Sequence, residues 1–307
     1  MANQQQATKP VPKEAVLIVN TRSRKGQKLF DQAVTKLEAA GIRLIEKHPI
    51  KDPGKLIPTV REAVRRGPPM VIIGGGDGSL SCAVDEVVDR DCVFALLPFG
   101  TANSFARTLG IPVDLDSAVQ VIATGKRRRV DLGSIDGDYF ANASSIGLSP
   151  LIGCTVPHKL KRYLGRPGYL MWAMWCLARF KSFELTVEGP DGKETLRALE
   201  VRIANGPFHG GIKVVDEATL DNGVIVVEAV SGGARTTLIS NWIRLLFGLP
   251  KRERQVRQFR GTELKLSTKP QLPISIDGEV MHRTPAAVAV AQGAIEVVVP
   301  ADAKPQG

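Results

Sequence analysis

Short apolar runs alternate with helical patterns over the first part of the chain. Ala15–Val19 is apolar at every position, and Met70–Ile73 and Val93–Leu97 repeat this pattern. Strands of this kind are buried on both faces, which is typical of a parallel sheet covered by helices. Between these runs, apolar residues recur at helical spacing. The alternation predicts an α/β arrangement. It adds a further strand at Ile42–Ile45 and helices that include Leu29–Ala40, Lys55–Arg66 and Leu80–Val88.

Polar and apolar residues alternate from about Leu132 onward, and turn signals such as Asn222-Gly223 separate the alternating runs. Alternation predicts strands with one buried face, and several in succession predict an antiparallel β-sandwich. Two helical insertions, at roughly 160–180 and 235–249, interrupt this part. The expected strands are Glu184–Glu188, Leu196–Ala204, Val224–Val230, Glu263–Ser267, Ile274–Ile276 and Ile295–Val299.

The chain has 307 residues, a length that favours two domains over one. We place an α/β domain at 14–133 and a β-sandwich domain at 134–300. The polar segments 1–13 and 301–307 are expected to be disordered tails.

The net charge of +10 favours polyanionic partners, which include nucleic acid, anionic lipid and nucleotide phosphates. Only 5% of the residues are aromatic, and they are not interleaved with the basic runs, so we expect no nucleic-acid partner. Cys82, Cys92, Cys154 and Cys176 form no CxxC pair, which favours a reducing cytoplasm over disulfides or zinc. The longest apolar run, Tyr169–Ala178, is too short to cross a bilayer.

A glycine-rich loop follows the apolar run Met70–Ile73 and opens a helical pattern. Glycines let backbone N–H groups approach phosphate oxygens closely, and the helix N-terminus adds a partial positive charge. Asp77 can hold Mg²⁺, because this ion binds few carboxylates together with phosphate oxygens. A tight turn capped by Asp77 or Ser79 is the alternative, but three glycines and an acid exceed what a turn requires. We predict phosphate binding by Gly75, Gly76, Asp77, Gly78 and Ser79.

Two further loops follow apolar strands and therefore lie at the same edge of the predicted sheet. Thr101 and Asn103 can hydrogen-bond phosphate or ribose, although a Gly-Thr turn with a capped helix and a solvated Arg107 explains them equally well. The loop after Ala15–Val19 carries basic and hydroxyl side chains that suit a nucleotide, while solvated surface cations are the more common outcome. Its candidate residues are Asn20, Thr21, Arg22, Ser23 and Arg24.

Together these loops resemble the diacylglycerol kinase catalytic-domain family, which also contains sphingosine kinases and bacterial lipid kinases. The matching motifs occur in the family's order and span residues 14 to 299, almost the whole chain. They are Gly75–Ser79, Gly100–Asn103, Val130–Gly133, Ala204–Gly206 with Gly210-Gly211, Ala218–Gly223 and Ile276–Glu279.

The resemblance implies an N-terminal α/β domain similar to phosphofructokinase and NAD kinase, a C-terminal β-sandwich that binds lipid, and a nucleotide cleft between them. It implies transfer of the γ-phosphate of ATP to a lipid hydroxyl of diacylglycerol, a sphingoid base or a related lipid. ATP would be bound by Asn20–Arg24, Gly76–Cys82 and Thr101, and Mg²⁺ by Asp77 with Asp131.

The resemblance also implies a catalytic pair, Asp277 and Glu279. Two residues two apart in a strand point to the same side, so one carboxylate can accept the hydroxyl proton while the other orients the acceptor. By themselves, Asp277-Gly278-Glu279 favour a hairpin turn with an exposed acid.

The chain departs from the family's pattern at several positions. Ser81-Cys82 stands where the family has Asn-Glu, Ser104 stands where it has Asp, and Asn222 stands where it has Asp. The first loop lacks the proline and glycine of the family's Asn-Pro-x-Ser-Gly. These departures predict altered metal binding or weaker activity, and Asn222 removes an acid from a second magnesium site found in some members.

Two segments suit contact with lipid. Tyr169–Phe180 is apolar nearly all round and follows several cations; it fits a membrane interface or an acyl groove, although a helix packed on the core is the favoured interpretation. The basic run Lys251–Arg260 fits an anionic surface or a solvated loop, and Arg127–Arg129 is expected to be a solvated turn. We expect a cytoplasmic protein whose lipid substrate lies at an anionic membrane surface, with a homodimer left open.

Two alternatives belong to other functional classes. An NAD kinase-like small-molecule kinase shares the Gly-Gly-Asp-Gly loop, but the Gly-Thr-x-Asn and Asp-Gly-Glu motifs count against it. A non-catalytic lipid- or nucleotide-binding relative is the alternative that is not an enzyme. Binding without turnover, in an assay with ATP and mixed lipids, would identify it.

Overall fold

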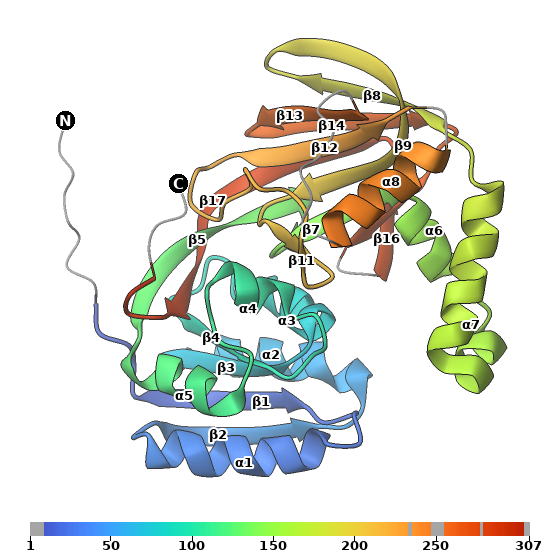
Figure 1. Ribbon diagram of the computed structural model, residues 1–307. Helices are drawn as coiled ribbons and strands as arrows, with labels where there is room; N and C mark the ends of the chain where they lie inside the picture. The colour runs from blue at the N-terminus through green and yellow to red at the C-terminus, as the bar shows by residue number, and fades with distance from the viewer. Residues whose placement is uncertain (1–8, 233–234, 247–254, 277–278, 304–307) are drawn as a thin grey trace. The chain divides into compact units, whose positions relative to one another are not determined.

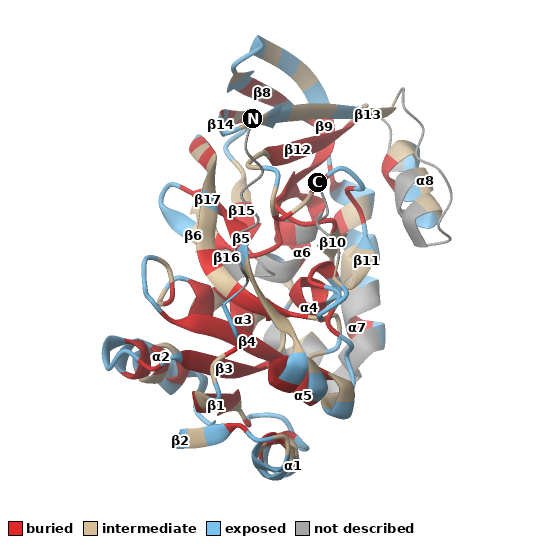
Figure 2. Ribbon diagram, turned by 90° about the vertical axis from the view of Figure 1, so that its left-hand side faces the viewer, coloured by how far each residue is buried: buried red, intermediate tan, exposed pale blue. Residues whose placement is uncertain are grey.

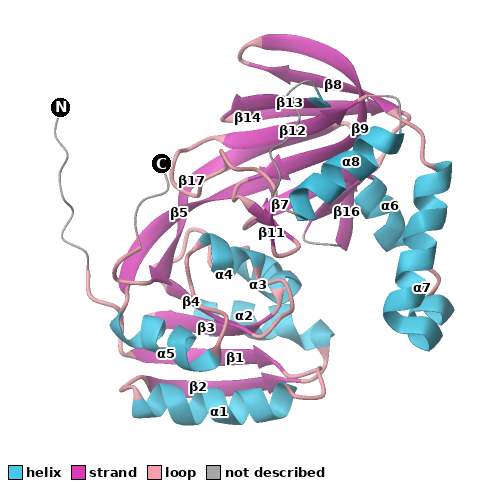
Figure 3. Cartoon of the chain, in the orientation of Figure 1, coloured by secondary structure: helices cyan, strands magenta, loops and turns pink. Residues whose placement is uncertain are grey.

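The computed structural model describes residues 9–232, 235–246, 255–276 and 279–303. The chain forms two compact units (Figures 1 and 3). Unit 1 comprises Met1–Leu132, Leu220–Asn222 and Ala291–Gly307, and unit 2 comprises Gly133–Thr219 and Gly223–Val290. Each unit is therefore assembled from stretches that lie far apart in the sequence.

Unit 1 contains a parallel sheet with the strand order β2-β1-β3-β4-β17. β1, β3 and β4 are buried along almost their whole length (Figure 2), which agrees with their continuous apolar sequences. β2 pairs only with β1, and its residues alternate between exposed and half-buried. The strands are β1 (Glu14–Asn20), β2 (Arg43–Ile50), β3 (Met70–Gly75), β4 (Val93–Pro98) and the end of β17 (Ala286–Val299).

Helices cover both faces of this sheet. α1 and α5 contact each other on one face, and α2 and α3 contact each other on the other (Figure 2). α1 buries Phe30, Ala33 and Leu37 at helical spacing, so a single stripe faces the sheet. The helices are α1 (Gly26–Ala39), α2 (Leu56–Arg65) after the 3₁₀ turn Pro53–Lys55, α3 (Asp77–Val84), α4 (Ser104–Thr108) and α5 (Leu115–Thr124).

Unit 2 is built from antiparallel strands. β9 pairs with β7, β8 and β12, β14 pairs with β8 and β17, and β15 pairs with β7 and β16. β13 pairs with β12, and β6 with β5. The strands are the end of β5 (Lys126–Ile135, of which 126–132 belong to unit 1), β6 (Asp138–Phe140), β7 (Ala143–Gly147), β8 (Phe183–Gly189), β9 (Gly192–Ala204), β10 (Phe208–His209), β11 (Ile212–Lys213), β12 (Ile225–Ser231), β13 (Val256–Gly261), β14 (Glu263–Lys269), β15 (Pro273–Ile276) and β16 (Glu279–Arg283).

The predicted helical insertions are confirmed as α7 (His158–Arg179) and α8 (Arg235–Leu246), with 247–249 outside the described residues. A further helix, α6 (Leu148–Thr155), joins them on unit 2. Buried residues of β7, β8, β9 and β12 form the main core of this unit, and side chains of α6 and α7 pack against it. None of the described helices is long and apolar enough to cross a membrane.

The helix predicted over Leu80–Val88 is confirmed with shifted bounds: it begins at Asp77 and ends at Val84, and residues 85–89 form turns. Two other expectations about local structure were wrong. Ile295–Val299 lies in β17, whose Glu296 and Val297 pair in parallel with β4, not in an antiparallel sheet. Arg127–Arg129 forms part of strand β5 and is no solvated turn, because Arg127 is paired with Glu296 and is largely buried.

The structure also describes part of each expected tail. Within 1–13, Val11 is buried and the Nζ of Lys13 donates a hydrogen bond of 2.6 Å to the carbonyl of Ala123. Within 301–307, the carbonyl of Ala303 accepts a hydrogen bond of 2.7 Å from Lys126 Nζ. Both contacts lie inside unit 1.

Candidate active site

Three loops leave the carboxyl ends of adjacent parallel strands in unit 1. β1 ends at Asn20, β3 at Gly75 and β4 at Pro98. The register pairs Val19 with Gly74 and Gly75 with Pro98, so the three ends lie at one edge of the sheet. This edge is where ligands bind in open α/β sheets.

The loops contact one another directly. Asn20 Nδ2 donates a hydrogen bond of 2.9 Å to Ser79 Oγ, which joins the first loop to the glycine loop. The backbone N–H of Phe99 donates to the carbonyl of Gly75 at 2.9 Å. Gly76 and Gly100 lie so close that a Cβ on Gly100 would stand 2.6 Å from the Cα of Gly76. The structure therefore brings the three predicted loops together.

The glycine loop has little room for side chains before α3. A Cβ on Gly74 would lie 2.9 Å from Phe99 and Val19 side chains, and a Cβ on Gly75 would lie 2.7 Å from the Cβ of Ser79. Gly76 precedes α3 in an extended conformation, and Asp77 is the first helical residue. Because the first N–H groups of a helix have no partner inside it, this end of α3 is suited to bind an anion.

Asp77 sits between two of the loops and is half-buried. Its Oδ1 accepts a hydrogen bond of 3.3 Å from the backbone N–H of Phe105, in the first turn of α4. A half-buried carboxylate beside the predicted phosphate loop fits the few-carboxylate coordination of Mg²⁺, and this role stays a prediction.

Nucleotide contact by Asn103 stays a prediction, and the structure shows the local contacts of its side chain. Asn103 is buried and adopts a left-handed conformation with φ of 50°. Its Oδ1 accepts from the N–H of Gly100 and its Nδ2 donates to the carbonyl of Gly100, each at 2.9 Å. The amide therefore closes the turn, and the exposed Thr101 presents the hydroxyl of this loop.

Arg107, for which a solvated cation was one of two alternatives, is exposed and also makes a local contact. Its Nε donates a hydrogen bond of 2.9 Å to the carbonyl of Ala102. This contact holds a guanidinium beside the second loop, next to Thr101. The spacing of an arginine one helical turn after Asn103 was the available signal in the sequence.

The first loop divides into a buried and an exposed part. Thr21 is buried, and its N–H donates to the carbonyl of Ile50 at 2.7 Å. Asn20 Oδ1 accepts from the N–H of Arg22 at 3.1 Å, which folds the loop back on itself. Arg22, Ser23 and Arg24 are exposed, so their cationic and hydroxyl groups are accessible to a ligand.

Asp131 differs from Asp77 in its surroundings. It is buried in β5, and its Oδ1 accepts a hydrogen bond of 2.8 Å from the N–H of Gly293. Its own N–H donates to the carbonyl of Leu220 at 2.7 Å. In the part of the chain that the structure describes, no group of three or more His, Cys, Asp and Glu side chains could hold a metal ion. Magnesium binding by Asp77 and Asp131 stays a prediction.

Comparisons with known proteins identify the family. The family model of the diacylglycerol kinase catalytic domain matches residues 14–135, and that of the YegS C-terminal NAD kinase beta sandwich-like domain matches residues 147–299. A protein of Enterobacter sp. (strain 638) named "Probable lipid kinase YegS-like" is 31% identical over 218 residues, which cover 69% of this chain and 72% of that protein. The chain belongs to the diacylglycerol kinase catalytic-domain family.

Other members of this family match nearly end to end. The "Diacylglycerol kinase" of Bacillus subtilis (strain 168) is 27% identical, and the match covers 94% of this chain and 97% of that protein. A solved structure of a diacylglycerol kinase from Bacillus anthracis str. Sterne has a TM-score of 0.77 at 22% identity and covers 95% of this chain and 98% of that one. This likeness confirms the predicted fold class, an α/β domain followed by a β-sandwich-like domain.

The departures from the family's pattern have visible surroundings. Ser81 is buried in α3, and its Oγ has no hydrogen-bond partner among the described residues. Cys82 is half-buried, and Ser104 is buried at the start of α4. Asn222 belongs to the segment Leu220–Asn222 that packs in unit 1 beside Asp131. The predicted glycine loop is thus followed by small side chains in place of the family's larger polar ones.

The predicted catalytic pair lies at the edge of what the structure describes. Asp277 and Gly278 are outside the described residues. Glu279 begins β16, where its backbone pairs with Ile276 of β15, and its side chain is outside the described part. The catalytic roles of Asp277 and Glu279 therefore stay predictions.

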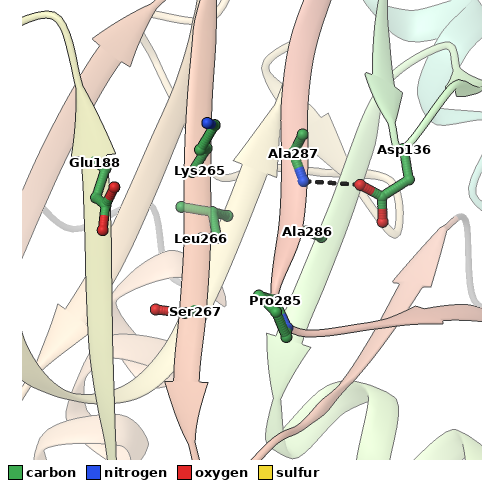
Figure 4. A pocket seen from close by; sticks show the side chains of 8 residues that line it. All are labelled: Asp136, Glu188, Lys265, Leu266, Ser267, Pro285, Ala286 and Ala287. Carbon is green, nitrogen blue, oxygen red and sulfur yellow. Dashed lines mark hydrogen bonds between the residues drawn. The ribbon is translucent and has the colours of Figure 1, made fainter.

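Unit 2 contains a separate pocket of about 310 Å³. β8, β14 and β17 supply its walls (Figure 4), and the Oδ1 of Asp136 accepts a hydrogen bond of 2.8 Å from the N–H of Ala287 at its rim. None of the residues predicted to bind ATP or Mg²⁺ lines it. Its lining residues are Asp136, Glu188, Lys265, Leu266, Ser267, Pro285, Ala286 and Ala287.

Proposed function

We propose that this family member transfers the γ-phosphate of ATP to a hydroxyl group of a lipid at a membrane surface. The observation that carries the proposal is the mutual contact of three loops at the carboxyl edge of the unit 1 sheet. This contact places the N-terminus of α3 and the exposed Thr101 on neighbouring loops, and backbone N–H groups and hydroxyls are the donors that a polyphosphate requires. The names of the relatives add lipid as the acceptor class.

The proposed roles follow from the local geometry. The N-terminus of α3 at Gly76–Ser79 binds phosphate oxygens, and the exposed Thr101 hydroxyl adds a donor. The exposed Arg22 and Arg24 neutralise phosphate charge from the first loop. Asp77 would hold Mg²⁺, which supplies charge neutralisation on the transferring phosphoryl group when it is bound.

Asp277 and Glu279 are proposed to act on the acceptor. One carboxylate accepts the proton of the lipid hydroxyl as its oxygen attacks the γ-phosphorus, and ADP leaves. The other carboxylate orients the hydroxyl. An assay with several lipid alcohols identifies the acceptor among diacylglycerol, a sphingoid base, ceramide and other lipid alcohols.

A transfer assay with labelled ATP and a panel of lipid alcohols in mixed vesicles tests the proposal. Asp77→Ala and Asp277→Asn are each expected to lower turnover by about 100-fold or more, because each removes a group that acts in the transition state. Asp116→Asn is the matched control, since this exposed carboxylate of α5 pairs only with Lys36 among the described contacts and should leave turnover unchanged.

Three results would contradict the proposal. Equal turnover in all variants would reject the assigned roles. Binding of ATP by calorimetry without transfer to any lipid would indicate a non-catalytic relative. Transfer to NAD instead of lipid would indicate a small-molecule kinase.

A further inference from the structure

Exposed large apolar side chains are concentrated on the helices of unit 2. In unit 1, Ile45 and Val113 are isolated exposed residues. α7 alone carries three, with exposed fractions of 61% for Met171, 71% for Met174 and 44% for Trp175. Single exposed apolar residues are ordinary, but several on one helix face indicate an interaction surface.

α7 has two apolar faces with different surroundings. Trp172, Ala173, Cys176 and Leu177 pack against the core of unit 2. Met171, Met174, Trp175 and Ala178 are exposed and recur at intervals of three and four, so they form a second stripe on the outside of the helix. We call these four residues the outer stripe of α7.

The outer stripe is held in place by specific contacts. The ring of Trp175 stacks on Trp172 with centroids 4.5 Å apart, and Trp172 Nε1 donates a hydrogen bond of 3.0 Å to Thr155 Oγ1. The guanidinium carbon of Arg179 lies 4.3 Å from the centroid of the Trp175 ring. The Trp175 ring is therefore held by Trp172 and lies beside a cation. Such a ring is suited to the boundary between the acyl chains and the charged headgroups of a bilayer.

The charge around the stripe has one sign. No Asp or Glu occurs between Asp138 and Glu184, whereas Arg179 and the exposed Lys181 stand at the end of α7. The whole chain carries a net charge of +10. This segment is therefore complementary to an anionic surface, because an apolar stripe with flanking cations gains both burial and electrostatic attraction there.

We propose that the outer stripe of α7 inserts into the interface of an anionic phospholipid bilayer. Met171, Met174 and Trp175 enter the boundary between headgroups and acyl chains, and Arg179 and Lys181 contact the lipid phosphates. The helix lies along the surface, as expected for an amphipathic segment that is too short in apolar length to span it. The inference rests on the proposed function, because it assigns the surface that brings the protein to its lipid acceptor.

Vesicle binding without ATP tests the inference independently of catalysis. Sedimentation is measured with phosphatidylcholine vesicles that contain or lack phosphatidylglycerol. Met174→Glu should weaken binding to the anionic vesicles by about tenfold or more, because it places a carboxylate in the apolar boundary. Val113→Glu is the matched control: it makes the same charge change at a residue with 46% exposure in unit 1 and should leave binding unchanged.

A second measurement locates the inserted residue. Phospholipids brominated on the acyl chain should quench the tryptophan fluorescence of the wild type, and Trp175→Phe should remove most of that quenching. Circular dichroism confirms that each variant is folded. These readouts do not depend on turnover.

Three outcomes would overturn the inference. The first is that the wild type does not bind anionic vesicles. The second is that Met174→Glu binds these vesicles as well as Val113→Glu does. The third is that Met174→Glu converts a dimer to a monomer and leaves vesicle binding intact, which would assign the stripe to a second copy of the chain. Absence of lipid phosphorylation with vesicle binding intact would instead reject the proposed function alone.

Discussion

Gly76 and Gly100 show how single residues set the geometry of the candidate site. A Cβ on Gly100 would lie 2.6 Å from the Cα of Gly76, so this position has no space for a side chain, whereas a Cβ on Gly76 would make a tight contact of 3.3 Å with the Cα of Gly100. The Asn103 amide completes this arrangement by holding both polar groups of Gly100. The distance between the glycine loop and the second loop is therefore fixed by these three residues.

Gly100→Ala is expected to destabilise unit 1 and weaken ATP binding. The new Cβ would lie 2.6 Å from Gly76 Cα and 2.8 Å from Asn103 Oδ1, so the two loops must separate. We expect a loss of about 1–3 kcal/mol in the free energy of unfolding. Urea denaturation and ATP titration measure the two effects.

Gly78→Ala is the control for that substitution. A Cβ on Gly78 meets nothing within 4 Å, and Gly78 lies inside α3. Alanine should therefore raise the unfolding free energy by about 0.5–1 kcal/mol. Equal stability of the two variants would show that the Gly76–Gly100 contact does not hold the loops.

Cys92 gives a prediction about reactivity. Its side chain is buried, and desolvation raises the pKa of the thiol to about 12. At pH 8 the thiol is therefore neutral in the folded protein and should not react with iodoacetamide. Mass spectrometry after brief labelling should find Cys92 unmodified until urea unfolds the chain; modification of Cys92 in the native protein would contradict its burial.

At the scale of elements, a buried network of ion pairs joins strands β9 and β12. Arg202 stands opposite Glu228 in the register and donates to Glu228 Oε1 at 2.9 Å and to Glu200 Oε2 at 3.0 Å. All three side chains are buried. Gln258 of β13 adds a hydrogen bond of 3.3 Å to Glu228, so the network extends over three strands.

Arg202→Met is expected to lower the unfolding free energy by about 3–5 kcal/mol. Methionine keeps the volume of the side chain but removes the Arg202 guanidinium from two buried carboxylates. Arg257→Met is the matched control, because Arg257 pairs with Glu194 of β9 while its side chain is 60% exposed, so the substitution should change stability little. Similar losses in both variants, measured by urea denaturation, would contradict a special role for burial.

At the scale of the whole molecule, unit 1 depends on residues near the end of the chain. The last part of β17 pairs in parallel with β4, and Gly293 donates to the buried Asp131. The segment Leu220–Asn222 also belongs to this unit. The contiguous stretch that contains all three loops of the candidate site is therefore an incomplete folding unit.

A fragment of residues 1–135 should not form a stable domain, although it contains the whole match to the catalytic-domain family model. Without β17 the buried strand β4 has an unpaired edge, which favours aggregation. We expect insoluble expression, or a soluble fragment without a cooperative thermal transition in far-UV circular dichroism. Truncation after Ala303 is the control and should fold; cooperative unfolding of 1–135 would refute the requirement for β17.

The sequence alone determined the elements whose patterns are local. β1, β3 and β4 were predictable because short, continuous apolar runs that alternate with helical patterns are typical of a parallel sheet covered on both faces. The three loops were predictable for the same reason, since consecutive parallel strands place their carboxyl ends at one edge. The order of motifs along the chain also indicated the family that the comparisons confirm.

Only the tertiary structure decided which distant residues meet. The alternation in Ile295–Val299 marks a strand but carries no information about its partner, so its place beside β4 could not be derived. The amide of Asn103 suits a ligand or a turn equally well, and the αL conformation that turns it toward Gly100 depends on the packing around it. Local periodicity reports burial, whereas pairing and hydrogen-bond partners are set by contacts between residues far apart in sequence, and these exist only once the chain is folded.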